Sequence, residues 1–146
     1  PKPEFGTIEL RVMDTPLTVE RAAQIAAYAQ ALASYLLKEK PFEPQEDDYL
    51  VYTYNRFQAC RFGYDGRLVV PGTAEQRVIR DDILRTMATI EMHAYDLGST
   101  EALNLLRTEV LEGRNGASEV RGVQTSEGSL EEVVRQGSER WAGRLS

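Results

Sequence analysis

Hydrophobic and polar residues alternate near the start of the chain. Over residues 6–14, the side chains of Ile8, Leu10 and Val12 alternate with those of Thr7, Glu9, Arg11 and Met13. This period of two is typical of a strand with one buried face, so we predict a strand over residues 6–14. A lone strand cannot satisfy its own backbone hydrogen-bonding groups. We therefore expect it to pair with strands from outside these residues or with a second copy of the chain.

Most of the remaining chain has apolar residues at helical spacing. The pattern predicts helices over about residues 19–38, 49–62, 74–97, 100–112 and 130–142. Thr18 suits the N-cap of the first helix, and Gly63 suits the end of the second. The segments 73–76 and 129–132 resemble capping boxes, in which a hydroxyl and a carboxylate or amide three residues later satisfy each other's backbone N–H groups.

Two segments are less regular. Residues 49–54 are also β-prone, which leaves a strand as the alternative to the helix over 49–62. Residues 67–71 suggest a short extended piece, and the polar stretch 114–128 suggests one helical turn near 117–123. Together the elements predict an α+β fold that is mostly helical, with one or two strands.

Composition narrows the functional classes. The chain has 146 residues, 42% of them hydrophobic, which is enough for one core. A net charge of −6, from 17 basic and 23 acidic residues, argues against a nucleic-acid partner. The most apolar stretch, residues 22–37, is too short and polar to span a membrane, and no leader is visible, so we expect no membrane and a cytoplasmic location. Because the chain begins with Pro1 and not with methionine, we expect either that residues were removed from its start or that it is a piece of something longer.

Cys60 and His93 are the only residues of their kinds. A single cysteine excludes a disulfide within the chain, and a single histidine excludes a metal site with two histidine ligands. We expect Cys60 to be a small buried residue. His93 lies on an apolar helical stripe, so we expect a packed histidine with one hydrogen bond.

Glu9 and Arg11 are two residues apart and share one face of the predicted strand. A carboxylate that ligates a hard cation, beside a guanidinium that neutralises phosphoryl oxygens, suits a magnesium–phosphate site. The alternative is a solvated ion pair on the wet face of a sheet.

A second cluster contains Asn55, Arg56 and Arg61. These side chains could bind a carboxylate or a nucleotide. On a helix Asn55 and Arg61 point in different directions, so only a subset would reach one ligand. The alternative is an amphipathic helix whose arginines pair with acidic residues.

Two motifs resemble those of a known family. Residues 5–16, FGTIELRVMDTP, resemble a signature of the type 2 glutamate–cysteine ligases, also called the carboxylate–amine ligase family. Residues 55–63, NRFQACRFG, resemble the family's Asn-Arg-Trp-x-Ala-x-Arg-Tyr-Gly element, with Phe57 and Phe62 in place of tryptophan and tyrosine. Weaker matches at residues 93–98, 113–117 and 129–134 extend the resemblance to about Trp141.

The resemblance implies that residues 1–146 are the C-terminal portion of one catalytic domain with a glutamine-synthetase-like fold. An N-terminal portion of the same enzyme, or another chain, would then complete its antiparallel sheet and much of its active site. Such enzymes use ATP and Mg²⁺ to phosphorylate the side-chain carboxylate of glutamate, and an amine such as that of cysteine attacks the acyl phosphate. A homo-oligomer and a role in glutathione biosynthesis are also implied, and this chain alone would be inactive.

The resemblance also assigns roles to residues. Glu9 becomes a metal ligand, Arg11 and Arg61 catalytic contacts, and Asn55 and Arg56 substrate or nucleotide contacts. The alternative function is a non-catalytic helical regulatory or interaction module derived from the same scaffold.

Overall fold

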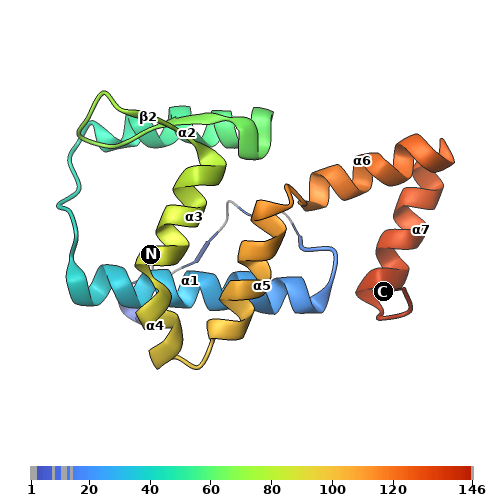
Figure 1. Ribbon diagram of the computed structural model, residues 1–146, viewed down its shortest axis with the longest axis horizontal. Helices are drawn as coiled ribbons and strands as arrows, with labels where there is room; N and C mark the ends of the chain where they lie inside the picture. The colour runs from blue at the N-terminus through green and yellow to red at the C-terminus, as the bar shows by residue number, and fades with distance from the viewer. Residues whose placement is uncertain (1–2, 8, 11–12, 14, 146) are drawn as a thin grey trace.

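Helix α1 (Val19–Glu39) forms where the apolar spacing predicts it. The Thr18 hydroxyl accepts a hydrogen bond from the backbone N–H of Arg21 at 3.1 Å, which caps the first turn. Lys40 then adopts a left-handed conformation with φ of 45° and ends the helix. The computed structural model of the chain describes residues 3–7, 9–10, 13 and 15–145 (Figure 1).

The segment that was ambiguous between helix and strand is helix α2 (Asp48–Phe62). A turn of 3-10 helix, η2 (Gly63–Asp65), follows it, and Gly63 has the positive φ expected of a helix-ending glycine. Next come two short antiparallel strands, β1 (Arg67–Val69) and β2 (Gln76–Val78), with Leu68 opposite Arg77. The extended piece predicted near residues 67–71 is therefore confirmed as β1.

The long helix predicted over residues 74–97 is wrong in two places. Residues 76–78 form β2, so the helical region starts only at α3 (Ile79–Thr89), and a break at Ile90 separates α4 (Glu91–Asp96). Thr73 is not a helix cap, because its hydroxyl donates to the carbonyl of Val70 and accepts from the N–H of Glu75 inside the hairpin turn. Residues 76–78 form a strand because they pair with β1. A local sequence pattern cannot show this pairing, since the partner residues lie elsewhere in the chain.

The last three helices are α5 (Thr100–Leu111), α6 (Gly116–Glu127) and α7 (Leu130–Trp141). The predictions for α5 and α7 are confirmed within one residue. Helix α6 is longer than the single turn expected, and a capping box between Asn115 and Ser118 stabilises its start. A short 3-10 helix, η1 (Pro3–Phe5), lies near the start of the chain.

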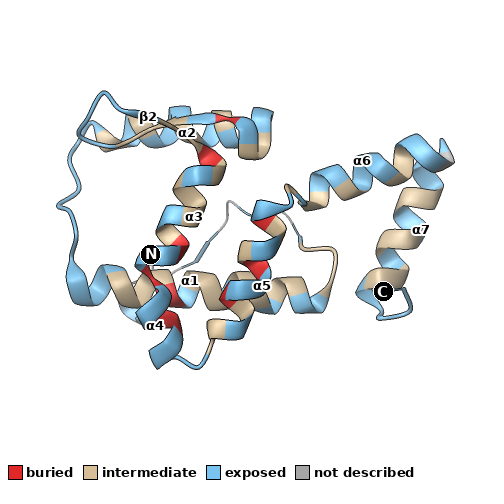
Figure 2. Ribbon diagram, viewed as in Figure 1, coloured by how far each residue is buried: buried red, intermediate tan, exposed pale blue. Residues whose placement is uncertain are grey.

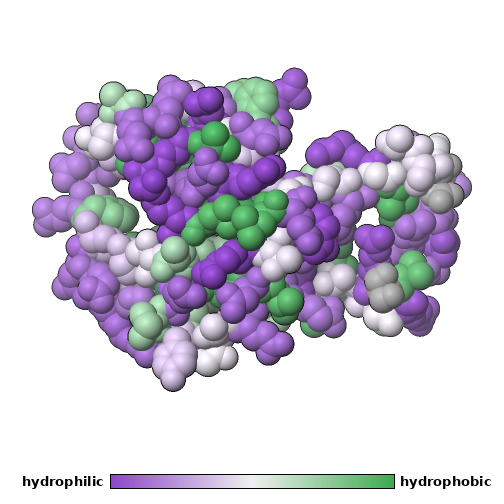
Figure 3. Space-filling view, viewed as in Figure 1, coloured by the Kyte–Doolittle hydropathy of each residue, from purple (hydrophilic) through white to green (hydrophobic). Residues whose placement is uncertain are grey.

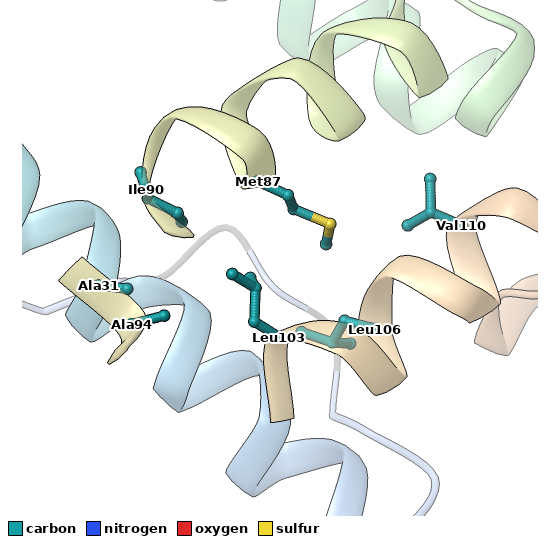
Figure 4. Close-up of a cluster of buried hydrophobic side chains, with 7 residues drawn as sticks. All are labelled: Ala31, Met87, Ile90, Ala94, Leu103, Leu106 and Val110. Carbon is teal, nitrogen blue, oxygen red and sulfur yellow. The ribbon is translucent and has the colours of Figure 1, made fainter. Parts of the chain in front are cut away.

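The core lies where α1, α3, α4 and α5 meet. Figure 4 shows its seven buried side chains: Ala31, Met87, Ile90, Ala94, Leu103, Leu106 and Val110. Ala31 and Ala94 are small and fully buried, so α1 and α4 approach closely. In contrast, no described side chain of α2, α6 or α7 is buried (Figure 2).

The strand predicted over residues 6–14 lies partly outside the described residues, which omit 8, 11, 12 and 14. Glu9, Leu10 and Met13 are described and do not belong to a strand, and Leu10 is 52% exposed. The expected buried face is therefore not seen at Leu10. The sheet formed by the described residues is the β1–β2 hairpin, which supports an α+β class. None of the described helices is both long and apolar enough to cross a membrane.

Candidate functional site

Asn55 is held against the backbone of β1. Its Nδ2 donates to the carbonyl oxygen of Val69 at 2.8 Å, and its Oδ1 accepts from the N–H of Val69 at 2.7 Å. These two bonds imitate the pairing that a neighbouring strand would provide. Both polar ends of this predicted substrate or nucleotide contact are therefore engaged within the chain.

Gln58, one helical turn later, continues the same contact. Its Oε1 accepts from the N–H of Arg67 at 3.4 Å, so two side chains of α2 bind alternate residues of β1. The buried Gly66 makes this close approach possible, because a Cβ atom there would lie 2.8 Å from the carbonyl oxygen of Gln58. The helix thus takes the place of a third strand beside the hairpin.

Arg56 and Arg61 point away from this contact and away from each other. They are five residues apart on a helix, so their directions differ by about 140°. The guanidinium of Arg56 lies 5.7 Å from the centre of the Tyr52 ring, and that of Arg61 lies 6.0 Å from the centre of the Phe62 ring. Both arginines are exposed. The structure therefore does not bring Asn55, Arg56 and Arg61 together around one ligand.

Of the predicted pair Glu9 and Arg11, only Glu9 lies among the described residues. Glu9 is exposed, and Arg11 lies outside the described residues. Among the described residues, no group of three or more histidine, cysteine, aspartate or glutamate side chains is placed to hold a metal ion. These residues do not form a complete magnesium site, and Glu9 could supply at most one carboxylate ligand.

His93 of α4 is buried against α1, as expected. Its Nδ1 lies 3.1 Å from the hydroxyl oxygen of Ser34, and the ring of Tyr35 meets it edge-on at 5.6 Å. The carboxylate of Glu39 lies 3.9 Å from Nε2, beyond hydrogen-bond distance. The prediction of a packed histidine with one hydrogen bond is confirmed.

The prediction for Cys60 is wrong, because its side chain is exposed on α2. Helix α2 packs against β1 with the side that carries Asn55 and Gln58, and Cys60 lies on the opposite side of the helix. A helical stripe shows which residues share a face but not whether another element covers that face.

A polar cluster beside the core was not predicted. Arg21 of α1 pairs with Glu109 of α5 at 2.8 Å and with Glu119 of α6 at 3.6 Å. Nearby, burial raises the pKa of the Tyr64 hydroxyl, which donates to the carbonyl oxygen of Arg114. No sequence signal could have found this cluster, because its members are far apart along the chain.

Comparison with known proteins agrees with the motif resemblance. The family model described as glutamate-cysteine ligase family 2 matches residues 1–136. A protein of Leptothrix cholodnii named "Putative glutamate--cysteine ligase 2" is 58% identical over 144 residues. Relatives with the same name from Cupriavidus metallidurans and Polaromonas naphthalenivorans are 57% and 54% identical over 143 residues.

The match covers these proteins unequally. It includes 99% of this chain but 38% of the L. cholodnii protein, and 98% of this chain but 38% of each of the other two relatives. The chain therefore spans less than two fifths of the length of the relatives it matches.

Proposed function

Because the chain belongs to glutamate-cysteine ligase family 2, we propose that it is one portion of an ATP- and Mg²⁺-dependent carboxylate–amine ligase. The match over residues 1–136 carries this proposal. The relatives' names supply the proposed substrates, glutamate and an amine such as that of cysteine. We place the activity in the cytoplasm, where a lone thiol stays reduced.

The proposed reaction has two steps. The γ-phosphoryl group of ATP passes to a side-chain carboxylate oxygen of glutamate, which gives an acyl phosphate and ADP. The amine then attacks the carbonyl carbon, phosphate leaves with the C–O bonding electrons, and an amide and a proton remain. Both steps build negative charge on phosphoryl oxygens, which arginine side chains stabilise.

The residues of this chain have different parts in the proposal. The exposed guanidinium groups of Arg56 and Arg61 are free to reach a phosphate or a carboxylate from outside the chain, and Arg11 is assigned the same role. Glu9 is a single ligand of Mg²⁺, whose other ligands would come from the rest of the enzyme and from ATP. Asn55 positions α2 on β1 and so sets the direction in which Arg56 and Arg61 point.

Reconstitution tests this function. The chain is mixed with ATP, Mg²⁺, glutamate and cysteine, with and without the portion of the L. cholodnii relative that lies outside the match, and ADP release is measured. We expect ADP only in the complete mixture. Its absence there would support the alternative, a non-catalytic module on the same scaffold.

The role of Glu9 is tested in the same mixture. Glu9→Gln removes the charge that a hard cation requires, so ADP release should fall at least about tenfold. Glu4→Gln, at an exposed carboxylate in the same segment, is the control and should release ADP like the wild type. Equal rates for both variants would exclude Glu9 as a ligand.

A further inference from the structure

Helix α2 leaves most of its surface uncovered. One side packs against β1 and η2, while the other sides expose a set of large side chains that we call the α2 face: Tyr49, Leu50, Tyr52, Tyr54 and Phe57. Figure 1 shows α2 on the far side of α3 from α1, away from the core. On the face seen in Figure 3, apolar side chains lie at the surface among polar ones in the region of the hairpin that packs against α2.

The composition of this helix is that of a protein interface. Tyrosine, phenylalanine and arginine are enriched in the buried centres of interfaces, and lysine and glutamate are depleted there. Helix α2 contains three tyrosines, two phenylalanines and two arginines, but no lysine or glutamate. Exposed apolar patches of this kind mark interaction sites on soluble proteins.

We propose that the α2 face docks against the remaining portion of the same longer enzyme. This inference rests on the proposed function, in which a portion outside these 146 residues completes the active site. The chain covers 38% of the L. cholodnii relative, so a much larger portion is available to cover the face. Docking here would bring that portion to Arg56 and Arg61, which lie on the same helix.

A second copy of the chain is a poorer occupant. In a two-fold symmetric contact each α2 face would meet an identical one. On whichever side of α2 the contact formed, Arg56 or Arg61 would approach the same cation of the other copy, and α2 offers only Asp48 as an acidic partner. Repulsion between these charges disfavours self-association through this face.

The first test is co-purification. The chain is co-expressed with an affinity-tagged portion of the L. cholodnii relative that lies outside the match. Tyr49→Asp and Leu50→Asp place a charge on the α2 face, in the first turn of the helix where aspartate does not weaken it. The matched controls are Tyr95→Asp and Met92→Asp on α4, at side chains 69% and 67% exposed against 72% and 70% for Tyr49 and Leu50.

The wild-type chain and both α4 variants should co-purify with the tagged portion. The amount of each α2 variant recovered with it should be at least tenfold lower. Circular dichroism checks that each variant keeps its helical content. Retention of the α2 variants at the wild-type level, or failure of the wild type to bind, would overturn the proposal. So would a dimer of the chain alone that dissociates on Tyr49→Asp.

The second test uses the only cysteine of the chain. Cys60 is exposed on α2, on the side away from β1, so docking should slow its reaction with a maleimide at least tenfold. The peptide that contains it is quantified by mass spectrometry. A Cys60→Ser, Tyr95→Cys variant serves as the control, and its cysteine should react at the same rate in the free chain and in the complex. Unchanged labelling of Cys60 in a co-purified complex would contradict docking through α2.

These readouts separate the two proposals. Retention and labelling report docking, and ADP release reports catalysis. A complex that protects Cys60 but releases no ADP would refute the ligase function and leave the docking surface in place.

Discussion

Asn55 shows how a single side chain can join two elements. A primary amide has a donor and an acceptor side by side, so it can pair with both backbone groups of one residue. Here it pairs with Val69, fourteen positions later. A motif residue that looks suited to a ligand is thereby used to orient the helix that carries Arg56 and Arg61.

Replacing Asn55 by alanine should therefore destabilise the chain. Asn55→Ala removes two hydrogen bonds and leaves partly buried backbone groups of Val69 without partners, which costs about 1–3 kcal/mol. Asn104→Ala, on an exposed position of α5, is the matched control and should stay within about 0.5 kcal/mol. Urea unfolding measures both. Equal stabilities of the two variants would show that the Asn55 contact contributes nothing.

Two glycines should respond in opposite ways to alanine. At Gly66 a Cβ atom would lie 2.8 Å from both the carbonyl oxygen of Gln58 and the side chain of Ile79, so Gly66→Ala should cost about 1–3 kcal/mol. At Gly122, inside α6, the same atom meets nothing within 4 Å. Gly122→Ala should therefore stabilise the chain by about 0.5–1 kcal/mol through higher helix propensity. Thermal unfolding of both variants checks the contrast.

At the scale of elements, α7 is supported more by its own side chains than by packing. Ser129 accepts from the N–H of Glu132 and caps the helix. Arg135 then donates to both oxygens of Glu132, one turn earlier, and also to Glu139, one turn later. Such pairs stabilise a helix locally, which suits an element with no buried side chain.

The carboxylate of Glu132 should titrate abnormally. The hydrogen bonds from Arg135, and then that from Gln136, lower its pKa from 4.5 to about 2. Because the pKa is lower in the folded state, the contribution to stability is full above pH 4.5 and is lost as the pH falls through about 2.

A carbon-detected NMR titration of the glutamate carboxyl groups measures this pKa. Arg135→Gln should raise the midpoint of Glu132 toward 4.5, and high salt should move it in the same direction because the pair is near the surface. A wild-type midpoint near 4.5 would contradict the observed pairing.

At the scale of the whole molecule, the core and the C-terminal helices are held by different forces. Helices α1, α3, α4 and α5 share buried apolar side chains. Helices α6 and α7 pack on each other and project to one side in Figure 1. Ion pairs of Glu119 with Arg21 and with Arg140 link α6 to α1 and to α7.

Arg21 should therefore matter more than an ordinary surface arginine. Arg21→Ala leaves Glu109 and Glu119 without their partner from α1, in surroundings where side chains are only 15–28% exposed, so it should cost about 1–3 kcal/mol. Hydrogen exchange in α6 and α7 should also become faster.

The control is Lys38→Ala, which breaks a pair with Asp96 whose two side chains are 57% and 56% exposed. An exposed pair contributes about 0–1 kcal/mol, so this variant should change stability and exchange little. If both variants behaved alike, the link between α1 and α6 would have no structural role.

The family and most helices could be predicted from the residues alone. Motif residues such as those of segment 55–63 indicate the family, and local caps at Thr18 and Ser129 mark helix starts. The helix predicted from residue 74 failed because Val78 pairs with Arg67, eleven positions away. The roles of the site residues stay predictions, since Asn55, Arg56 and Arg61 point in different directions on α2.

The sequence by itself determined where most of the helices lie, because apolar period and capping are local properties. Only the tertiary structure decided which apolar side chains are covered: Ile90 is fully buried, while Leu50, equally apolar, is 70% exposed. It also decided that Asn55 binds β1 and that Cys60 faces outward. Burial and pairing depend on partners that are distant in sequence, and for α2 we propose that the partner belongs to the rest of the enzyme.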